Sequence, residues 1–403
     1  MKKRKLEFGI DEFTLVAQAD TSKLDSVKKW PSMASGIMFD MAKTANMQKL
    51  FGDVHKVGNP PAGYTVGITF GNNPFYFAIA HHPLFVKMGV VLKFSAHAWS
   101  EYQTRWQTRY HEIMNIAKFL KLFGEADYEI RLSRIDFTAD FFNYPLTVDM
   151  LYTQISMSDP KIVVYDSLHR LNISKLSAVV ADGVVNTFYL GSKKANTDIL
   201  LRVYNKKLQQ TQPPGVRYQR AIAEDAWVRM EVVFKGTYAH QLTDILLNEV
   251  KTEQDLLNLI ANKINEKYVF WSTITDKPIL FSKDLQDKTN KAFNRLVNNS
   301  PRDNDLARSV SYIRHGSGFY PILFKIQQIW GKSALYRFVK LLLQDYKSYY
   351  KPNPDVEIWL RKHKSAIQNT SLDDLFLRNI NKNLDNENDQ NSSRKQNTGH
   401  NDS

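Results

Sequence analysis

Tyr204 is the residue of this chain with the clearest potential for chemistry, because a cation stands two positions away on either side of it. In the stretch TDILLRVYNKKLQQ, residues 197–210, Arg202 precedes it and Lys206 follows it. Side chains two apart on a strand share one face, so a strand here would group the three. Opposite charge favours the phenolate, so we expect Tyr204 to ionise more easily than an ordinary tyrosine. The cations would also hold a phosphate. The cluster suits a nucleophile for phosphodiester cleavage; the alternative is a half-buried tyrosine with solvated basic neighbours.

Four stretches share one alternation, with apolar residues at every second position and polar or charged residues between them. They are residues 89–98, 131–142, 197–210 and 227–236. This pattern predicts an α+β fold with a largely antiparallel sheet that helices cover on one face and that is wet on the other. Neighbouring strands lie about 4.8 Å apart, so the wet face would gather Asp136, Glu231 and the Tyr204 cluster, with His97 as a further candidate.

Carboxylates on this wet face indicate a hard divalent cation, Mg²⁺ or Mn²⁺. Asp136 and Asp140 are about 13 Å apart along a regular strand, so both cannot bind one ion unless the strand is bulged. We therefore expect Asp136 and Glu231 to be the ligands and keep Asp140 in reserve. The alternative is that Asp136 forms an ion pair with Arg134 or Arg229.

The charge of the chain points to a polyanionic partner. Its 54 Lys and Arg residues exceed its 41 Asp and Glu residues, which gives a net charge of +13, and 12% of its residues are aromatic. Cations interleaved with aromatic rings suit a surface that follows a nucleic-acid strand and stacks on its bases. A merely basic soluble enzyme is the alternative. The cations that we expect to contact DNA are Arg134, Arg229, Lys193 and Lys194.

Several classes of protein are disfavoured by what the sequence lacks. It contains no cysteine, which removes thiol catalysis and zinc–thiolate sites. No run approaches about 18 apolar residues, so we expect no membrane span. The basic start has no apolar core, and we expect a cytoplasmic protein. A phosphate-binding loop of the Gly-x-x-x-x-Gly-Lys-Ser/Thr type is absent too.

The composition and the hydrophobic pattern divide the chain into three parts. Residues 1–250 carry the alternating strands and form the predicted catalytic domain. Residues 253–377 are mainly helical in pattern and basic, which predicts a second, DNA-binding or accessory domain. From residue 380 to 403 almost no apolar residue occurs, which predicts a disordered tail.

Five ordered motifs in this chain resemble the replication initiation factor family, the rolling-circle initiators of small plasmids and the nicking relaxases of integrative elements. The motifs are IDEFTL, MGVVLKFSAHAW, RLSRIDFTAD, TFYLGSKKANTDILLRVYNKK and WVRMEVVFKG, and together they lie within residues 9–245. The most specific is the Tyr-Leu-Gly-Ser block followed by Leu-Arg-Val-Tyr-Asn-Lys.

The resemblance implies a site- and strand-specific DNA nickase. The nucleophile of the family corresponds to Tyr204, and its metal-binding acids correspond to Asp136 and Glu231. It also implies origin DNA with an inverted repeat as the substrate, a 5′-phosphotyrosine intermediate, a homodimer and a partner helicase. Arg202 and Lys206 would stabilise charge in the transition state.

Two other functions remain open on the sequence alone. One is a non-catalytic DNA-binding repressor or replication accessory, which needs only the charge and the helical domain. The other is a metal-dependent nuclease with water as the nucleophile, which would leave free 5′-phosphates and no DNA linked to the protein.

Overall fold

The computed structural model describes residues 2–19, 27–72, 75–192, 197–296, 306–315, 317–352, 354–368 and 371–372. It divides into two compact units, residues 1–297 and 298–403, and each is described by itself. The predicted disordered tail, 380–403, lies outside the described residues. The predicted boundary at residues 250–253 differs from this division, because the helix that follows it packs inside the first unit.

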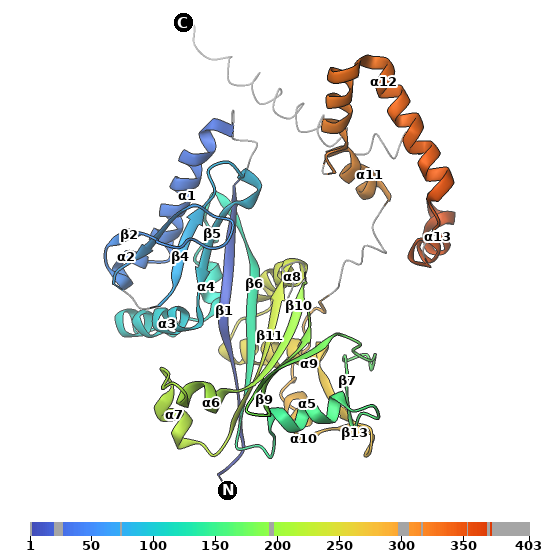
Figure 1. Ribbon diagram of the computed structural model, residues 1–403. Coiled ribbons are helices and arrows are strands. Elements are labelled where there is room, and N and C mark those ends of the chain that lie inside the picture. The colour runs from blue at the N-terminus through green and yellow to red at the C-terminus, as the bar shows by residue number, and fades with distance from the viewer. Residues whose placement is uncertain are drawn as a thin grey trace, which may run out of the picture. The chain divides into compact units, whose positions relative to one another are not determined.

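The first unit is built on a ten-stranded sheet (Figure 1) in which every strand pair is antiparallel. The strands in sheet order are β2 (Val54–Lys56), β3 (Val66–Phe70), β4 (Phe77–His81), β5 (Val90–Phe94), β1 (Lys5–Ala19), β6 (Tyr128–Phe142), β11 (Trp227–Lys235), β10 (Ile199–Asn205), β9 (Val184–Gly191) and β8 (Leu176–Ala181). A second sheet of three strands contains β13 (Lys277–Pro278), β12 (Val269–Ser272) and β7 (Ile162–Tyr165).

The alternation of residue types decides which face of the large sheet is buried. On β6, Phe137 and Ala139 point into the main hydrophobic core, and on β11 Met230 and Val232 do the same. The residues between them point to the opposite, polar face. The predicted α+β fold with a largely antiparallel sheet is confirmed.

Helices cover the apolar face of the sheet. Side chains of α1, α3, α4, α5, α8, α9 and α10 enter the main core, and Figure 1 shows α8 and α9 behind β6 and β11. The helices of the first unit are α1 (Trp30–Thr44), α2 (Met47–Phe51), α3 (Ala96–Tyr110), α4 (Ile116–Lys121), α5 (Val148–Ser156), α6 (Lys206–Thr211), α7 (Tyr218–Ala223), α8 (Gly236–Asn248), α9 (Glu253–Lys267) and α10 (Leu280–Gln286), with short 3₁₀ turns at Val27–Lys29 and Val86–Met88.

Helix α9 explains why the first unit extends beyond residue 250. A capping box starts it, in which Thr252 and Asp255 satisfy each other's backbone N–H groups. Its apolar side, including Leu259 and Ile264, lies in the main core. Contacts of α9 with β1 and β6 therefore bind this segment to the sheet domain.

A bulge in β1 changes which side chains reach the polar face. Ile10 is opposite Phe137 of β6 and Phe13 is opposite Ile135, so two residues of β1 face a single residue of β6. Asp11 and Glu12 therefore both stand on the polar face, where a regular strand would place only one of them.

The second unit is helical in its described part, as predicted. It contains α11 (Leu306–His315), α12 (Phe319–Tyr349) and α13 (Pro354–Ile367). Gly331, with φ of 82°, interrupts α12 at a kink. Across both units, no helix of the described chain is long and apolar enough to cross a membrane.

Candidate active site

Tyr204 lies on the polar face of the sheet, near the end of β10. Its hydroxyl donates to Oε2 of Glu231 at 3.3 Å and accepts from Nζ of Lys206 at 3.4 Å. The guanidinium carbon of Arg202 lies 4.1 Å from the centre of the ring, which is cation–π distance. The structure therefore brings Tyr204 together with both of its predicted cations and with one of its predicted acids.

Burial is the main influence on the phenol. The ring of Tyr204 is 2% exposed, although it stands on the polar face and not in the main hydrophobic core. This burial raises the pKa of the phenol well above its ordinary value; the charge of Arg229 opposes the shift, and that of Glu231 adds to it. The expectation that its cations make Tyr204 easier to ionise is therefore wrong for this structure. Ionising this hydroxyl requires a base beside it.

Lys206 reaches Tyr204 from a helix and not from the strand. The predicted strand ends at Asn205, whose side chain accepts a hydrogen bond from the backbone N–H of Leu208 at 2.9 Å and caps α6. Lys206 is the first residue of that helix, and its side chain is buried. Burial and the nearby positive charge of Arg229 lower the pKa of Lys206 to about 8.

Asp136 and Glu231 lie on adjacent strands of the polar face, and each is paired with an arginine. Asp136 accepts from Nε and Nη2 of Arg134 at 2.8 and 2.6 Å, so one predicted alternative, the ion pair with Arg134, is present. Oε1 of Glu231 lies 3.5 Å from Nη1 of Arg202. Burial raises the pKa of both carboxyl groups, that of Asp136 to about 7, and the charge of Glu231 adds to the shift of Asp136.

Two of the three predicted metal ligands are neighbours on the polar face. Asp136 is opposite Val233 of β11, and Glu231 is opposite Thr138 of β6, so the two acids are diagonal neighbours on one face. Buried carboxylates that repel each other favour a hard cation between them. The described residues contain no group of three or more His, Cys, Asp or Glu side chains that could hold an ion. Water or phosphate oxygens would have to complete the shell, which is common for Mg²⁺.

Asp140 does not fit as a metal ligand, because three hydrogen bonds already occupy it. Nε and Nη2 of Arg229 and Nε1 of Trp227 each donate to it at 2.7 Å. Nη1 of Arg229 lies 2.7 Å from Oδ1 of Asp11, and the arginine is 2% exposed. The prediction that Arg229 contacts DNA is corrected accordingly. Its guanidinium group is buried and forms ion pairs with two aspartates, Asp140 and Asp11.

We expect Arg229→Ala to destabilise the first unit by about 3–5 kcal/mol, because it leaves the buried carboxylate of Asp140 without its partner. Chemical denaturation followed by circular dichroism would measure the change in the free energy of unfolding. Arg220→Ala is the matched control, since Arg220 pairs with the partly exposed Glu7 and should cost about 1 kcal/mol or less. Equal losses for the two variants would contradict the internal role of Arg229.

Two acids of β1 stand beside the site, and the sequence patterns missed both. Glu12 lies 2.8 Å from Nη1 of Arg134 and 3.1 Å from Nζ of Lys93, while Asp11 holds Arg229. The similarity between GIDEFTL at residues 9–15 and RIDFTAD at residues 134–140 was the available signal. Alternation alone places only one of the two acids on this face; the bulge adds the other.

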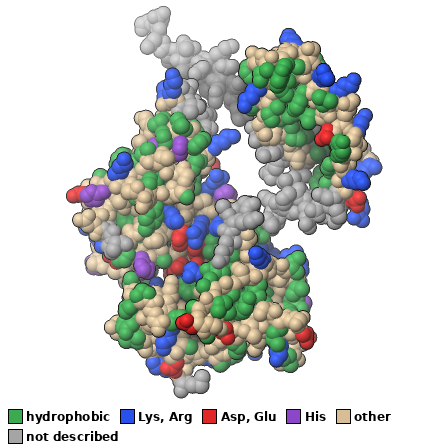
Figure 2. Space-filling view, viewed as in Figure 1, with side chains coloured by type: hydrophobic (Ala, Val, Ile, Leu, Met, Phe, Trp, Pro, Cys, Tyr) green, Lys and Arg blue, Asp and Glu red, His purple; other side chains and the backbone are tan. Residues whose placement is uncertain are grey.

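A polar groove runs beside the buried tyrosine. One cavity of about 400 Å³ opens between β1, β6 and α7, and a smaller one of about 70 Å³ lies between α3 and α6. Asp11 and Arg217 line both, and Lys206 lines the smaller one. Figure 2 shows acidic and basic side chains side by side in a hollow at the middle of the first unit. The groove offers cations next to the tyrosine.

His97 and three predicted DNA contacts, Arg134, Lys193 and Lys194, remain to be placed. The strand predicted over residues 89–98 ends at Phe94, because Ser95 caps helix α3 by accepting from the N–H of Ala98. His97 therefore stands in the first turn of α3, where it lines the smaller cavity. Arg134 is partly exposed at the rim of the polar face. The other two predicted DNA contacts, Lys193 and Lys194, lie outside the described residues.

Comparison with known proteins gives one family. Residues 130–318 match the family model described as replication initiation factor. No curated protein matches the chain. A solved structure of a rolling circle replication initiator protein from Geobacillus stearothermophilus is similar, with a TM-score of 0.47 and 17% sequence identity, over 70% of this chain and 97% of that one. The matched residues hold three of the five motifs, as well as Tyr204, Asp136 and Glu231. Residues 130–318, somewhat less than half of the chain, are thus similar to the replication initiation factor family.

Proposed function

We propose that this chain initiates rolling-circle replication by nicking one strand of origin DNA, with Tyr204 as the nucleophile. The observation that carries the proposal is the placement of its hydroxyl between a carboxylate, Glu231, and an ammonium group, Lys206, beside a polar groove. A phenol with a raised pKa needs a base, and Glu231 is within reach of its proton. The family match supports replication initiation as the setting.

The polar groove is the path that we assign to the unpaired strand. Arg217 lines both of its cavities. Burial of its guanidinium group and the charge of Arg229 lower the pKa of Arg217, and the charge of Arg220 adds to the shift. Such crowded positive charge is relieved when a phosphate binds. Because Tyr204 is 2% exposed, a phosphate reaches its hydroxyl only after Lys206 and the segment α6–α7 move aside.

The cleavage step uses residues that already touch one another. Glu231 takes the proton from the hydroxyl of Tyr204, and the phenolate oxygen attacks the phosphorus in line. The bond from phosphorus to the 3′ oxygen breaks, this oxygen takes a proton from water, and the 5′-phosphate stays on Tyr204. The charges of Arg202 and Lys206 stabilise the negative charge that develops on the phosphate. The free 3′-OH then serves as a primer.

Asp136 and Glu231 are the residues that would hold Mg²⁺ or Mn²⁺. When bound, the ion supplies Lewis-acid polarisation of the scissile phosphate. To bind the ion, Asp136 would give up its ion pair with Arg134. Oε1 of Glu231 would be the oxygen available to the ion, since Oε2 accepts the hydrogen bond of Tyr204. Arg134 then lies at the rim as a contact for the DNA backbone.

Nicking should depend on metal and on pH through Asp136. Its pKa of about 7 means that the carboxyl group is protonated below that pH, so metal affinity should rise as pH increases through about 7. We expect EDTA to abolish nicking, and Asp136→Asn to raise the Mn²⁺ concentration for half-maximal rate by about 10-fold or more. Metal titrations between pH 6 and 8.5 measure both. A variant with an unchanged metal requirement would remove Asp136 from the site.

One assay separates this proposal from its two alternatives. Supercoiled plasmid that carries the origin is incubated with the protein and Mn²⁺, and the products are run with and without protease. Nicked circles with protein on the 5′ end support the nickase. Nicked circles with free 5′-phosphates favour a nuclease that uses water, and intact supercoiled DNA favours a non-catalytic repressor or replication accessory.

The second unit is where we place the partners of the nicking domain. Its helices and the basic surface would bind the origin at an inverted repeat, and a host helicase would join the complex.

None of the described residues of α12 is buried, and several of its large apolar side chains are more than half exposed. Among them are Phe324, Trp330 and Tyr336. An apolar surface of this kind favours a protein partner, and we assign it to a second copy of the chain. A cytoplasmic location accompanies this function.

We expect the protein to be a dimer and the double variant Phe324→Ser with Trp330→Ser to be a monomer. Removing two large apolar side chains from an interface typically weakens association by roughly 10-fold or more. Light scattering coupled to gel filtration measures the mass, and Lys332→Ser, an exposed cation on the same helix, is the control. A monomeric wild type would show that α12 has some other partner.

A further inference from the structure

A cavity at the edge of the sheet lies apart from the tyrosine site. It measures about 280 Å³ and is formed by α1, α2 and the strands β2 and β3. Phe70 of β3 lines it and belongs to the main core, so the cavity lies on the apolar side of the sheet, whereas Tyr204 stands on the polar side. In the sheet, β5, β1, β6 and other strands separate β3 from β10. None of the predicted site residues that the structure describes lines this cavity.

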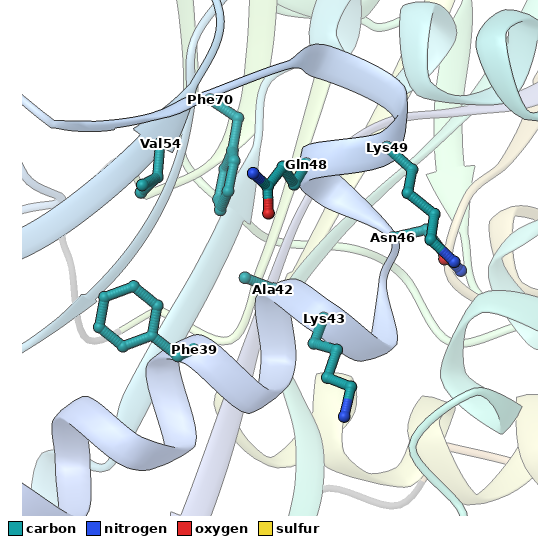
Figure 3. Close-up of a pocket in the computed structure, with 8 residues that line it drawn as sticks. All are labelled: Phe39, Ala42, Lys43, Asn46, Gln48, Lys49, Val54 and Phe70. Atoms are coloured by element: carbon teal, nitrogen blue, oxygen red, sulfur yellow. The ribbon is translucent and has the colours of Figure 1, made fainter.

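Aromatic rings provide its apolar part. Phe70 is almost fully buried, whereas Phe39 is 53% exposed, a high fraction for so large an apolar side chain. Figure 3 shows Phe39, Val54 and Phe70 along one side of the cavity and Gln48 next to Phe70. Rings that are partly open to solvent are the surfaces on which single-stranded nucleic acids stack their bases.

Cations and amides provide its polar part. Lys43 at the end of α1 and Lys49 on α2 are exposed and line the cavity together with the amides of Asn46 and Gln48. Among the lining residues that the structure describes, none is acidic. Lysine is a phosphate ligand, and an amide can donate to and accept from the edge of a base. The lining therefore matches the two chemical parts of a nucleotide.

We propose that this cavity binds one unstacked base of the unpaired origin strand, with Lys43 and Lys49 on the flanking phosphates. The inference rests on the proposed function, which supplies the unpaired DNA. The cavity is smaller than the about 300–1,000 Å³ that take drug-sized ligands, so it suits a single base. Two cations, with no acid among the described residues that line the cavity, favour a nucleic acid over an apolar helix of a protein partner.

The first test is the affinity for a fluorescent single-stranded oligonucleotide with the origin sequence, measured by anisotropy. Phe39→Ala should weaken binding by about 5- to 100-fold, as expected for the loss of one stacked base. Phe85→Ala is the matched control, because Phe85 is 55% exposed and lies outside the cavity. Lys43→Gln with Lys49→Gln should reduce the slope of log Kd against log salt by about 1.4. Affinities and salt slopes equal to those of the wild type would overturn the proposal.

The second test locates the base and separates the two proposals. An oligonucleotide that carries 5-iododeoxyuridine at successive positions is irradiated with the wild-type protein, and the cross-linked peptide is identified. A cross-link to residues 39–54 supports the cavity even if no adduct forms at Tyr204, in which case only the nicking chemistry fails. Cross-links confined to the polar groove overturn the cavity while leaving nicking intact. If deoxyadenosine monophosphate at micromolar concentration abolishes the cross-link to residues 39–54, the ligand of the cavity is a free nucleotide. This result would also overturn the proposal that the cavity binds a base of the origin strand.

Discussion

We expect Tyr204→Phe to abolish the covalent protein–DNA adduct and to lower the nicking rate by roughly 10³-fold or more, because it removes the only oxygen of this side chain that could attack phosphorus. The ring stays, and with it the cation–π contact with Arg202. Origin binding and the thermal midpoint should therefore change little. The measurement is a denaturing gel of labelled origin DNA after incubation with Mn²⁺, together with an anisotropy titration of the same DNA.

Tyr189→Phe is the control for this experiment. Tyr189 on β9 is opposite Arg202 and so stands on the same polar face, but one strand further from Glu231. It is half-buried and therefore closer to solvent than Tyr204. We expect the Tyr189 variant to nick like the wild type. If the adduct instead survives in Tyr204→Phe and disappears in Tyr189→Phe, the nucleophile has been assigned to the wrong strand.

Glu231→Gln should lower the nicking rate by about 10²- to 10⁴-fold, the range that general-base catalysis contributes. Glutamine keeps the size of the side chain and its hydrogen bond with the tyrosine hydroxyl but cannot take the proton. Burial raises the pKa of Glu231, so its carboxylate, the form that acts as a base, becomes populated only above the ordinary glutamate range. The wild-type rate should rise with pH through that raised pKa. The variant should lose this rise.

The pH profile has to be measured at saturating Mn²⁺, where the titration of Asp136 no longer limits the rate. Glu12→Gln is the matched control, because Glu12 is an acid of the same face that pairs with Lys93 and Arg134 and has no hydrogen bond to the tyrosine. Its rate and pH profile should resemble those of the wild type. A Glu231→Gln enzyme with the same pH dependence as the wild type would mean that another group takes the proton.

The alternation of residue types fixed much of the candidate site in advance. Residues two apart on β6, β10 and β11 share a face, so the polar positions of these strands had to meet wherever the strands were neighbours. The sheet order β6-β11-β10 makes them neighbours, and Tyr204, Arg202, Glu231 and Asp136 lie together as a result. Local periodicity was sufficient because this part of the site is a property of single strands and their pairing.

Burial and charge pairing could not be obtained from the same pattern. Lys206 belongs to α6 and not to the strand, and Tyr204, whose hydroxyl it contacts, is buried and therefore harder to ionise. Arg229, expected on the surface, is enclosed by Asp140 and Asp11. The enclosure of Arg229 depends on residues that are far apart in the chain, and strand periodicity contains no information on such contacts.

By itself, the sequence determined the α+β sheet, its polar face and the grouping of a tyrosine with acids and cations, and it indicated the resemblance to the replication initiation factor family. These properties follow from residue type at a spacing of two, which the geometry of a strand converts directly into a shared face. Only the tertiary structure decided how deeply Tyr204 is buried, that Asp140 is occupied by Arg229, and that a bulge turns both Asp11 and Glu12 toward the site. The physical reason is that hydration and ion pairing depend on all neighbours in space, and these are brought together by distant parts of the chain.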